Sequence, residues 1–354
     1  MYRNEPDTGM LLRLATPLEE VLGMRKTALP LATMVAALLT SVLALATTET
    51  PARAAFPGVN GKITFLSDRH GNNEIYTISF RDGKWGNAKR LTINAKSDKT
   101  PSFSPNGKKI VWERGDNLYK MDADGTGQRR IPNTTHFNFE IGRYGSYGGN
   151  PAYSPGGKKI IFDKGKDIWT INPDGTDRNR ITDALAGDPS AAKPTFVHPV
   201  WSPVSNKIAF SWIYQGAREI HVMALSDLSN EKILGASSRI TPAGIGVYRP
   251  DWSPDGKKIV YECSEAPCES GTSHSHNPNI YKVNADGSNN IPIVTSSADD
   301  SYPVFSPGGG KIVFSSDRDG DEELYIKDAD GSGKALQVTH NQSRDVEPDW
   351  RPVR

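Results

Sequence analysis

The sequence has no excess of charge of either sign, because its 354 residues carry a formal net charge of +1. A near-neutral chain lacks the overall field that would attract nucleic acid or an acidic partner. Neither is therefore expected as a partner. Sustained helical periodicity is also missing after residue 55, which argues against a helical fold.

The common catalytic motifs are missing as well. The chain contains no Gly-x-Ser-x-Gly turn, no His-Glu-x-x-His motif and no phosphate loop ending in Gly-Lys-Ser/Thr. Asp-x-Asp-Gly segments, such as Asp122 to Gly125, resemble the start of a calcium loop but lack its distal glutamate at the required spacing. They are predicted to be turns, and we expect no catalytic residue, metal or cofactor.

Cysteine is scarce: the two residues of this type, Cys263 and Cys268, enclose only four others. In an oxidising compartment, this spacing predicts a disulfide that closes a short loop after a strand. Free thiols are one alternative. The other is a metal site completed by His274 and His276.

One long apolar run stands near the N-terminus. Arg25-Lys26 precede the run from Ala28 to Ala46, and Ala52-Arg53-Ala54 follow it. This order predicts a secretory signal peptide cleaved near Ala54, and hence a secreted or periplasmic protein of the cell envelope. The alternative is an uncleaved membrane anchor. Residues 1–54 are thus an extension plus signal, with Met24 as another possible start, and residues 55–354 form the folded domain.

Glycine and proline are plentiful, with 33 and 25 residues, and they recur at similar places. Pro250–Tyr261 predicts a strand, a turn at Ser253-Pro-Asp-Gly and a second strand. The segment has four further copies: Pro101–Trp112, Pro151–Phe162, Pro199–Phe210 and Pro303–Phe314. The period of about 50 residues is typical of a propeller or solenoid, in which one small sheet cannot bury its faces alone.

Each copy is followed by a third strand, a turn and a fourth strand. There are six third strands, at residues 74–76, 117–119, 167–169, 219–221, 279–281 and 323–325. We therefore predict an all-β fold, a six-bladed β-propeller of four-stranded antiparallel blades. The first blade lacks its innermost strand, and Pro348–Pro352 is an innermost strand with nothing after it. The C-terminal strand should complete blade 1 and close the ring, leaving no free sheet edge.

Several repeated segments resemble those of TolB-type propellers, which are built from WD40-like (PD40) repeats. They are Ser67–Tyr76, Ser315–Tyr325, the Trp-Ser-Pro-Asp-Gly-Lys-Lys-Ile copy at 252–259 and the Asn/Asp-Ala-Asp-Gly turns. The resemblance covers residues 56–354 and implies a six-bladed propeller in the cell envelope. TolB carries an α/β domain before its propeller, whereas here the signal runs almost directly into blade 1. The contacts of that domain are therefore not implied. The same repeat precedes the hydrolase domain of prolyl-oligopeptidase-like enzymes.

The Ser-Asp-Arg segments of these copies have a structural explanation. In Ser67-Asp68-Arg69 and Ser316-Asp317-Arg318, we expect the carboxylate to cap a loop and to pair with the adjacent arginine. A metal-binding role is the alternative. Some propeller lyases hold a metal with several histidines in the channel, but of the seven histidines here only His198 precedes an innermost strand.

In a propeller, the loop before each innermost strand lines one mouth of the central channel, a concave place that ligands prefer. The residues immediately before the strand-initiating prolines are Thr100, Asn150, His198, Arg249, Tyr302 and Glu347. We predict a recognition surface here, with a solvated polar rim as the alternative. Four aromatic residues of a nearby loop, Phe137, Phe139, Tyr144 and Tyr147, resemble the anchors of an interface. Their packing over a blade edge is the competing explanation.

These features favour an exported, non-catalytic and monomeric binding or scaffold propeller. Its predicted partner is an envelope protein, a peptide or a glycan at the channel mouth. It would touch the membrane only through an uncleaved N-terminal segment. The alternative is an envelope hydrolase or lyase with Glu347 or Asp300 as the acid/base group, assisted by His198 and Arg249.

Overall fold

The computed structural model describes residues 59–134, 140–142, 145–147, 149–182, 194–225, 237–242, 246–264 and 277–353. The predicted signal peptide lies outside these ranges, so both the signal and the domain boundary at residue 54 remain predictions. Within the ranges, no helix has the length and apolar character needed to span a bilayer.

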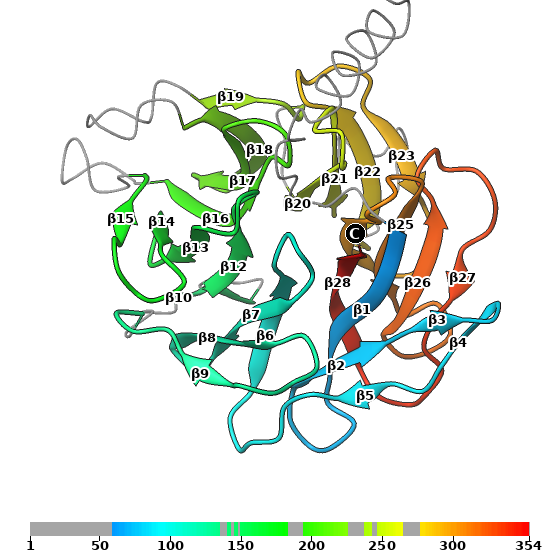
Figure 1. The fold of residues 1–354 in the computed structure, drawn as a ribbon. Coiled ribbons are helices and arrows are strands. Elements are labelled where there is room, and N and C mark those ends of the chain that lie inside the picture. The colour runs from blue at the N-terminus through cyan, green and yellow to red at the C-terminus, as the bar shows by residue number, and fades with distance from the viewer. Residues whose placement is uncertain are drawn as a thin grey trace, which may run out of the picture. The chain divides into compact units, whose positions relative to one another are not determined.

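The described residues form six four-stranded antiparallel sheets arranged around an axis, as predicted (Figure 1). Blade 2 contains β6 (Asp98–Phe103), β7 (Lys109–Arg114), β8 (Asn117–Asp122) and β9 (Arg129–Arg130). Blade 3 contains β12 (Gly149–Tyr153), β13 (Ile160–Lys164), β14 (Asp167–Ile171) and β15 (Asn179–Arg180). Blade 4 contains β16 (Thr195–Trp201), β17 (Lys207–Tyr214), β18 (Ala217–Ala224) and β19 (Ser237–Arg239).

Two more blades are continuous in sequence and have the same four strands. The described residues also form two separate two-stranded hairpins. Blade 5 contains β20 (Val247–Trp252), β21 (Lys258–Cys263), β22 (Asn279–Asn284) and β23 (Ile291–Val294). Blade 6 contains β24 (Asp300–Phe305), β25 (Lys311–Ser316), β26 (Glu323–Asp328) and β27 (Leu336–Gln337). The hairpins are β3 (Phe80–Arg81) with β4 (Lys84–Trp85), and β10 (Glu140–Gly142) with β11 (Gly145–Tyr147).

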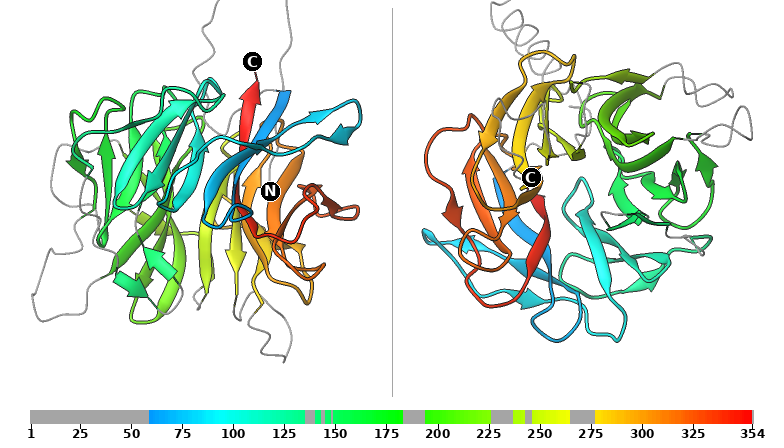
Figure 2. Two further views of the ribbon diagram at one scale, coloured as in Figure 1. Left: turned by 90° about the horizontal axis from the view of Figure 1, so that it is seen from below. Right: turned by 180° about the vertical axis from the view of Figure 1, so that it is seen from behind.

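Blade 1 is assembled from both ends of the propeller. Its strand order is β28 (Asp345–Val353), β1 (Val59–Ser67), β2 (Glu74–Ile78) and β5 (Lys89–Arg90). The antiparallel pairing of β28 with β1 confirms the predicted ring closure, and Figure 2 shows the two strands side by side. The indole of Trp350 in β28 also donates a hydrogen bond to the carbonyl of Gly61 at 3.2 Å. The pairing covers the edge that β1 would otherwise expose.

In blades 2, 3, 5 and 6, the turn between the first two strands is fixed by a Ser-Pro-x-Gly sequence. In blade 5, Gly256 has a φ of 66°, which favours glycine, and its amide donates to the carbonyl of Ser253 at 2.8 Å. The Ser253 hydroxyl accepts from the amide of Lys258 at 2.9 Å. This side-chain bond locks the register at the start of β21, and Ser104, Ser154 and Ser306 make the same bond in their blades.

The hydrophobic core is divided into six clusters, one for each pair of neighbouring blades. The cluster between blades 4 and 5, for example, packs Ile220 and Ile240 against Trp252, Ile259 and Tyr261. Five others occupy the remaining interfaces. Each large side chain buried in this way contributes about 1.5–3 kcal/mol. Polar groups at the inner strands are therefore held on a rigid frame.

The Asp-x-Asp-Gly segments are turns. The Asp124 carboxylate accepts from the amide and the hydroxyl of Thr126 at 2.9 and 2.7 Å, and equivalent bonds close the turns at Asp174, Asp286 and Asp330. Each carboxylate thus accepts hydrogen bonds within its own turn, which stabilises that turn. Among the described residues, no group of three or more His, Cys, Asp or Glu side chains could hold a metal ion.

Candidate binding site at the central channel

The residue before each inner-strand proline has a left-handed backbone in all six blades. The values of φ run from 34° at Asn150 to 56° at Tyr302. They also include those of Thr100, His198, Arg249 and Glu347. This conformation is uncommon outside glycine and asparagine. Its recurrence at one position of six different sequences indicates that the geometry of the inner strand requires it.

A β-bulge is the cause of this conformation. In blade 2 the pair Lys99–Glu113 is followed by the pair Ser102–Val111, so the inner strand holds one extra residue at this point. Equivalent register shifts occur in the other five blades. A bulge leaves one residue unpaired and can redirect its side chain. The next residue is a proline, which has no backbone N–H and is tolerated at a bulge because no hydrogen bond between the strands is lost there. The six predicted residues therefore share one place beside the axis.

Arg249 and Tyr302 form a tight cluster between blades 5 and 6. Nη1 of Arg249 lies 2.8 and 3.0 Å from the two carboxylate oxygens of Glu262. The guanidinium also stacks 4.1 Å from the centre of the Tyr302 ring. Burial lowers the pKa of Arg249, but the charges of Glu262 and Tyr302 outweigh it and raise that pKa above its ordinary value. The arginine is thus a permanent, compensated cation.

Glu347 connects blade 1 to blade 2. Its Oε2 atom accepts a hydrogen bond from the amide of Thr100 at 2.7 Å. The other acid proposed for catalysis, Asp300, is fully buried and is bound by Nη2 of Arg318 at 2.5 Å and by the hydroxyl of Ser296 at 2.7 Å. Both carboxylates therefore have structural partners. Neither is placed as a free acid/base group.

In blades 2 and 3, the carboxyl groups that face the bulge, Glu113 and Asp163, form no such ion pair among the described residues. Glu113 in β7 is 2% exposed, and burial raises its pKa to about 9. It points toward blade 3, where a Cβ on Gly149 would lie 2.2 Å from its Oε2 atom. Glycine at this position, with a φ of 91°, makes room for the carboxyl. Asp163 in β13 is also fully buried, burial raises its pKa to about 7, and the amide of Asn150 donates to it at 2.9 Å.

Three of the buried polar atoms that have no hydrogen-bond partner among the described residues lie at the bulges. They are Oγ1 of Thr100, Nδ1 of His198 and Oγ of Ser211. Burial first, and then the charge of Arg249, lowers the pKa of His198 well below its ordinary value, so the imidazole is neutral at pH 7. Buried polar atoms in native proteins are nearly always bonded, to protein or to something else. Thr100 and His198 are half-buried and Ser211 is fully buried, so only a group that reaches between the inner strands could bond to these atoms.

Sequence reasoning missed Glu113, Asp163, Ser211 and Glu262, which all face the bulge from the second strand. Each stands four residues after a lysine, at Lys109, Lys159, Lys207 and Lys258. A carboxylate in the middle of an otherwise apolar strand, at the same offset in three repeats, was the available signal.

The Ser-Asp-Arg segments correct one prediction. Arg69 does not pair with the adjacent Asp68; its Nη2 atom binds the buried Asp345 at 2.7 Å, 276 residues away in the sequence. Arg318 likewise binds Asp300, and Arg114 binds Asp98. The reason is that ring closure and blade packing place the first residue of an inner strand under the arginine, which also stacks on ring faces. The loop-capping part was right, since Asp68 accepts from the amide of Arg344 at 3.0 Å.

Two further predictions stay open. Phe137, Phe139 and Tyr144 lie outside the described residues, and the backbone of Tyr147 pairs with Glu140 in the hairpin of β10 and β11. Their role as interface anchors therefore remains a prediction. Cys263 ends β21 and is buried, but Cys268 lies outside the described ranges, so the disulfide also remains a prediction.

No protein-family model matches the chain. In sequence, 169 residues are 27% identical to an uncharacterized protein of Agrobacterium fabrum, a match that covers 45% of this chain and 52% of that protein. A further 109-residue match, 32% identical, is to an uncharacterized peptidase of Bacillus subtilis and covers 30% of this chain and 16% of the peptidase. The chain thus spans about half of the first relative and a small part of the second.

Solved structures share the fold. TolB from Acinetobacter baumannii matches with a TM-score of 0.62 at 20% identity, over 82% of this chain and 67% of TolB. A chain of a nidogen/laminin complex matches with a TM-score of 0.57 at 14% identity, over 82% and 98%. Puromycin hydrolase matches with a TM-score of 0.50 at 17% identity, over 69% and 39%. The predicted resemblance to TolB-type propellers is confirmed at the level of the fold, which binding proteins and enzymes share.

Proposed function

We propose that this chain is an exported, non-catalytic binding propeller that takes an envelope protein, a peptide or a glycan at its channel mouth. The observation that carries the proposal is the set of three buried polar atoms without partners, on Thr100, His198 and Ser211. A partner with hydrogen-bonding groups would satisfy them. The predicted signal peptide supports export.

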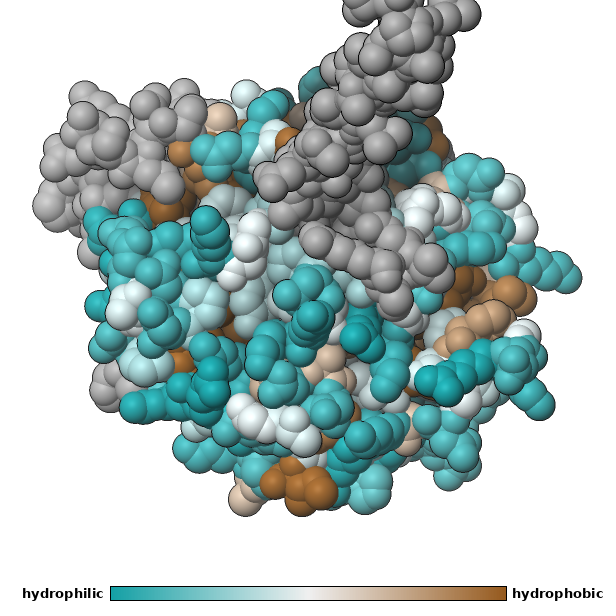
Figure 3. Space-filling model, in the orientation of Figure 1, coloured by the Kyte–Doolittle hydropathy of each residue, from teal (hydrophilic) through white to brown (hydrophobic). Residues whose placement is uncertain are grey.

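The character of the surface also favours polar recognition. On the face drawn in Figure 3, hydrophobic side chains form small separate patches among hydrophilic ones. The exposed large hydrophobic residues of the described chain, Phe80, Ile93, Val204 and Leu336, come from four different segments. A large apolar docking face would be contiguous. Hydrogen bonds at the channel are therefore the better basis for recognition.

The catalytic alternative has less support. Its two acid/base candidates, Asp300 and Glu347, are engaged by Arg318 and by the Thr100 amide. Arg249, assigned an assisting role, is engaged by Glu262. A general acid or base needs a free face toward a substrate.

Affinity capture from the envelope fraction of the host tests the proposal. Wild type would be compared with the double variant Thr100→Asn and His198→Asn, since asparagine tolerates the left-handed backbone and leaves the bulge intact. The matched control is Asp82→Asn with Gln215→Asn, two exposed left-handed residues away from the inner strands.

We expect a component captured by wild type and by the control to be lost from the double variant. Its affinity, measured afterwards with the purified component, should fall about tenfold or more in the double variant. Equal capture by all three proteins would contradict a binding role for the channel mouth. Turnover of a glycan or peptide by wild type would instead favour the hydrolase or lyase.

A further inference from the structure

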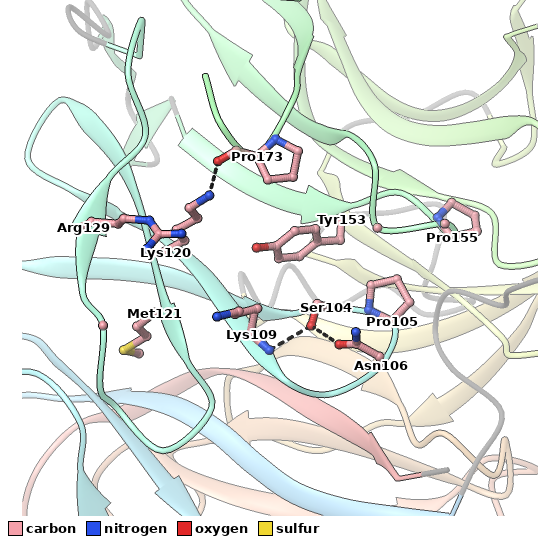
Figure 4. Close-up of a pocket in the computed structure, with 13 residues that line it drawn as sticks. Ser104, Pro105, Asn106, Lys109, Lys120, Met121, Arg129, Tyr153, Pro155 and Pro173 are labelled. Atoms are coloured by element: carbon pink, nitrogen blue, oxygen red, sulfur yellow. Dashed lines mark hydrogen bonds between the residues drawn. The ribbon is translucent and has the colours of Figure 1, made fainter. Parts of the chain in front are cut away.

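A pocket separate from the channel mouth lies between blades 2 and 3. Its volume is 410 Å³, within the range of small-molecule sites. Blade 2 contributes the turn from Ser104 to Lys109, the end of β8 and Arg129 of β9, and blade 3 contributes Tyr153 and the turn at Pro155 to Gly157 (Figure 4). The pocket is thus framed by two neighbouring turns of the repeat.

The lining of this pocket has three cations and no acidic side chain. Lys109 is paired with Asp122 at 2.6 Å, and Lys120 donates to the carbonyl of Pro173. Arg129 is exposed and has no ion-pair or hydrogen-bond partner for its guanidinium among the described residues. Burial first, and then the charge of Arg129, lowers the pKa of Lys120. An anion between Lys120 and Arg129 would relieve this repulsion.

The repeats provide an internal control for this arrangement. The strand pairs place Lys120 opposite Arg129 in blade 2. At the same two positions the other blades hold Thr77 with Lys89, Thr170 with Asn179, Val222 with Ser238, Lys282 with Ile291, and Ile326 with Leu336. Blade 2 alone combines two cations there. The pair is therefore not a requirement of the blade fold.

Blade 3 adds a second feature that the other blades lack. Tyr153 stands where they have Phe103, Trp201, Trp252, Phe305 and Trp350, so this position has a hydroxyl only in blade 3. Its ring is 5% exposed, while its hydroxyl points into the pocket toward the side of Lys120 and Arg129 (Figure 4). Among the described residues, no hydrogen bond to this hydroxyl occurs. It is free to donate to a ligand.

We propose that the pocket between blades 2 and 3 binds a small organic anion, whose phosphate or carboxylate group is held by Arg129, Lys120 and the hydroxyl of Tyr153. The planar guanidinium suits both groups because it can donate two parallel hydrogen bonds. The body of the ligand lies against the ring of Tyr153 and the nearby prolines. The site is separate from the channel mouth, so this proposal does not depend on the proposed function and is tested independently of it.

Isothermal titration calorimetry of the full chain tests this site with three probes that share a sugar ring and differ in the group at carbon 6. They are glucose 6-phosphate, glucuronate and neutral glucose. Wild type would be compared with Arg129→Gln and with the matched control Arg130→Gln, which removes the same charge from the next residue. Tyr153→Phe tests the hydroxyl separately. Arg129 is exposed, so its loss should not affect folding.

We expect at least one anionic probe to bind and glucose not to bind. Arg129→Gln should weaken that binding about tenfold, Tyr153→Phe about threefold, and Arg130→Gln less than twofold. Tighter binding of glucose 6-phosphate would identify the phosphate as the preferred group, and tighter binding of glucuronate the carboxylate. Absence of binding by both anions, or equal losses in the two arginine variants, would overturn the proposal.

Discussion

Blades 2 and 5 hold a glutamate at the same place in the repeat but give it different neighbours. Glu113 in β7 and Glu262 in β21 both pair with the residue just before the left-handed position. In blade 5 that position is Arg249, which binds Glu262 at 2.8 Å. In blade 2 it is Thr100, which has no charge, and burial raises the pKa of Glu113 to about 9.

The difference teaches that the fold provides the buried position, while the residue with the left-handed backbone decides whether the carboxylate receives an ion pair from it. Glu262 has a bound cation, whereas the charge of Lys99 offsets only part of the effect of burial on Glu113. The bulge puts that deciding residue next to the carboxyl in both blades. At the level of the bulges, the channel therefore has a compensated side, formed by Arg249, Glu262 and Tyr302 of blades 5 and 6, and an uncompensated side at blades 2 to 4, where the unpartnered atoms of Thr100, His198 and Ser211 lie.

The largest effect is expected from Arg249→Met, which makes blade 5 resemble blade 2. Glu262, which is 5% exposed, would lose its cation, and the free energy of unfolding should fall by about 3 kcal/mol at pH 7. Urea unfolding measures the loss. The double variant Arg249→Met with Glu262→Gln should recover most of it, and failure to recover would show that the ion pair is not the cause.

A smaller effect, with a distinct pH dependence, is expected from Glu113→Gln. The pKa of Glu113 is about 9 in the folded protein and 4.5 for an unperturbed glutamate, so the folded state binds more protons between these values. Ionisation of Glu113 in the unfolded chain therefore lowers wild-type stability as the pH rises through this window. The variant should match wild type near pH 4 and exceed it by about 1–3 kcal/mol at pH 7.

Thermal or urea unfolding of both proteins at several pH values checks this result. Glu262→Gln is the matched change in blade 5 and should instead destabilise the protein, since it leaves Arg249 without its carboxylate. A pH-independent difference between wild type and Glu113→Gln would contradict the raised pKa.

The smallest effect on stability is expected from Lys109→Ala, at the first residue of β7, the strand that also contains Glu113. Lys109 and Asp122 form an ion pair, but their side chains are 45% and 43% exposed. Blade 5 has Lys258 and Asn284 at these positions and forms its strands equally well. The free energy of unfolding should change by no more than about 0.5 kcal/mol. A loss above about 1 kcal/mol would mean that exposed pairs matter to the ring.

The sequence predicted the fold well because its information is local. Ser-Pro-x-Gly turns, alternating apolar strands and a period of about 50 residues recur along the chain, and the unpaired copy at Pro348–Pro352 implied the closed ring. The residues before the six prolines do occupy equivalent positions in the blades, and their role as a recognition surface remains a prediction. Their left-handed backbone could not be foreseen, because it follows from a bulge, which is a property of paired strands.

Contacts between residues far apart in the sequence were the part that sequence reasoning missed. Arg69 pairs with Asp345 instead of Asp68 because ring closure brings together residues 276 positions apart. Glu113 was not singled out from the sequence, since its burial depends on the space left by Gly149 in the next blade. Such contacts depend on how neighbouring sheets pack, which a single repeat does not encode.

The most direct test of the account compares the two sides of the channel in binding. The purified component captured by wild type would be titrated against His198→Asn, on the uncompensated side, and Tyr302→Asn, on the compensated side. Both changes introduce asparagine, which tolerates the left-handed backbone of these positions. The account predicts a loss of affinity of about tenfold for His198→Asn and less than about threefold for Tyr302→Asn. Equal losses, or a larger loss for Tyr302→Asn, would contradict it.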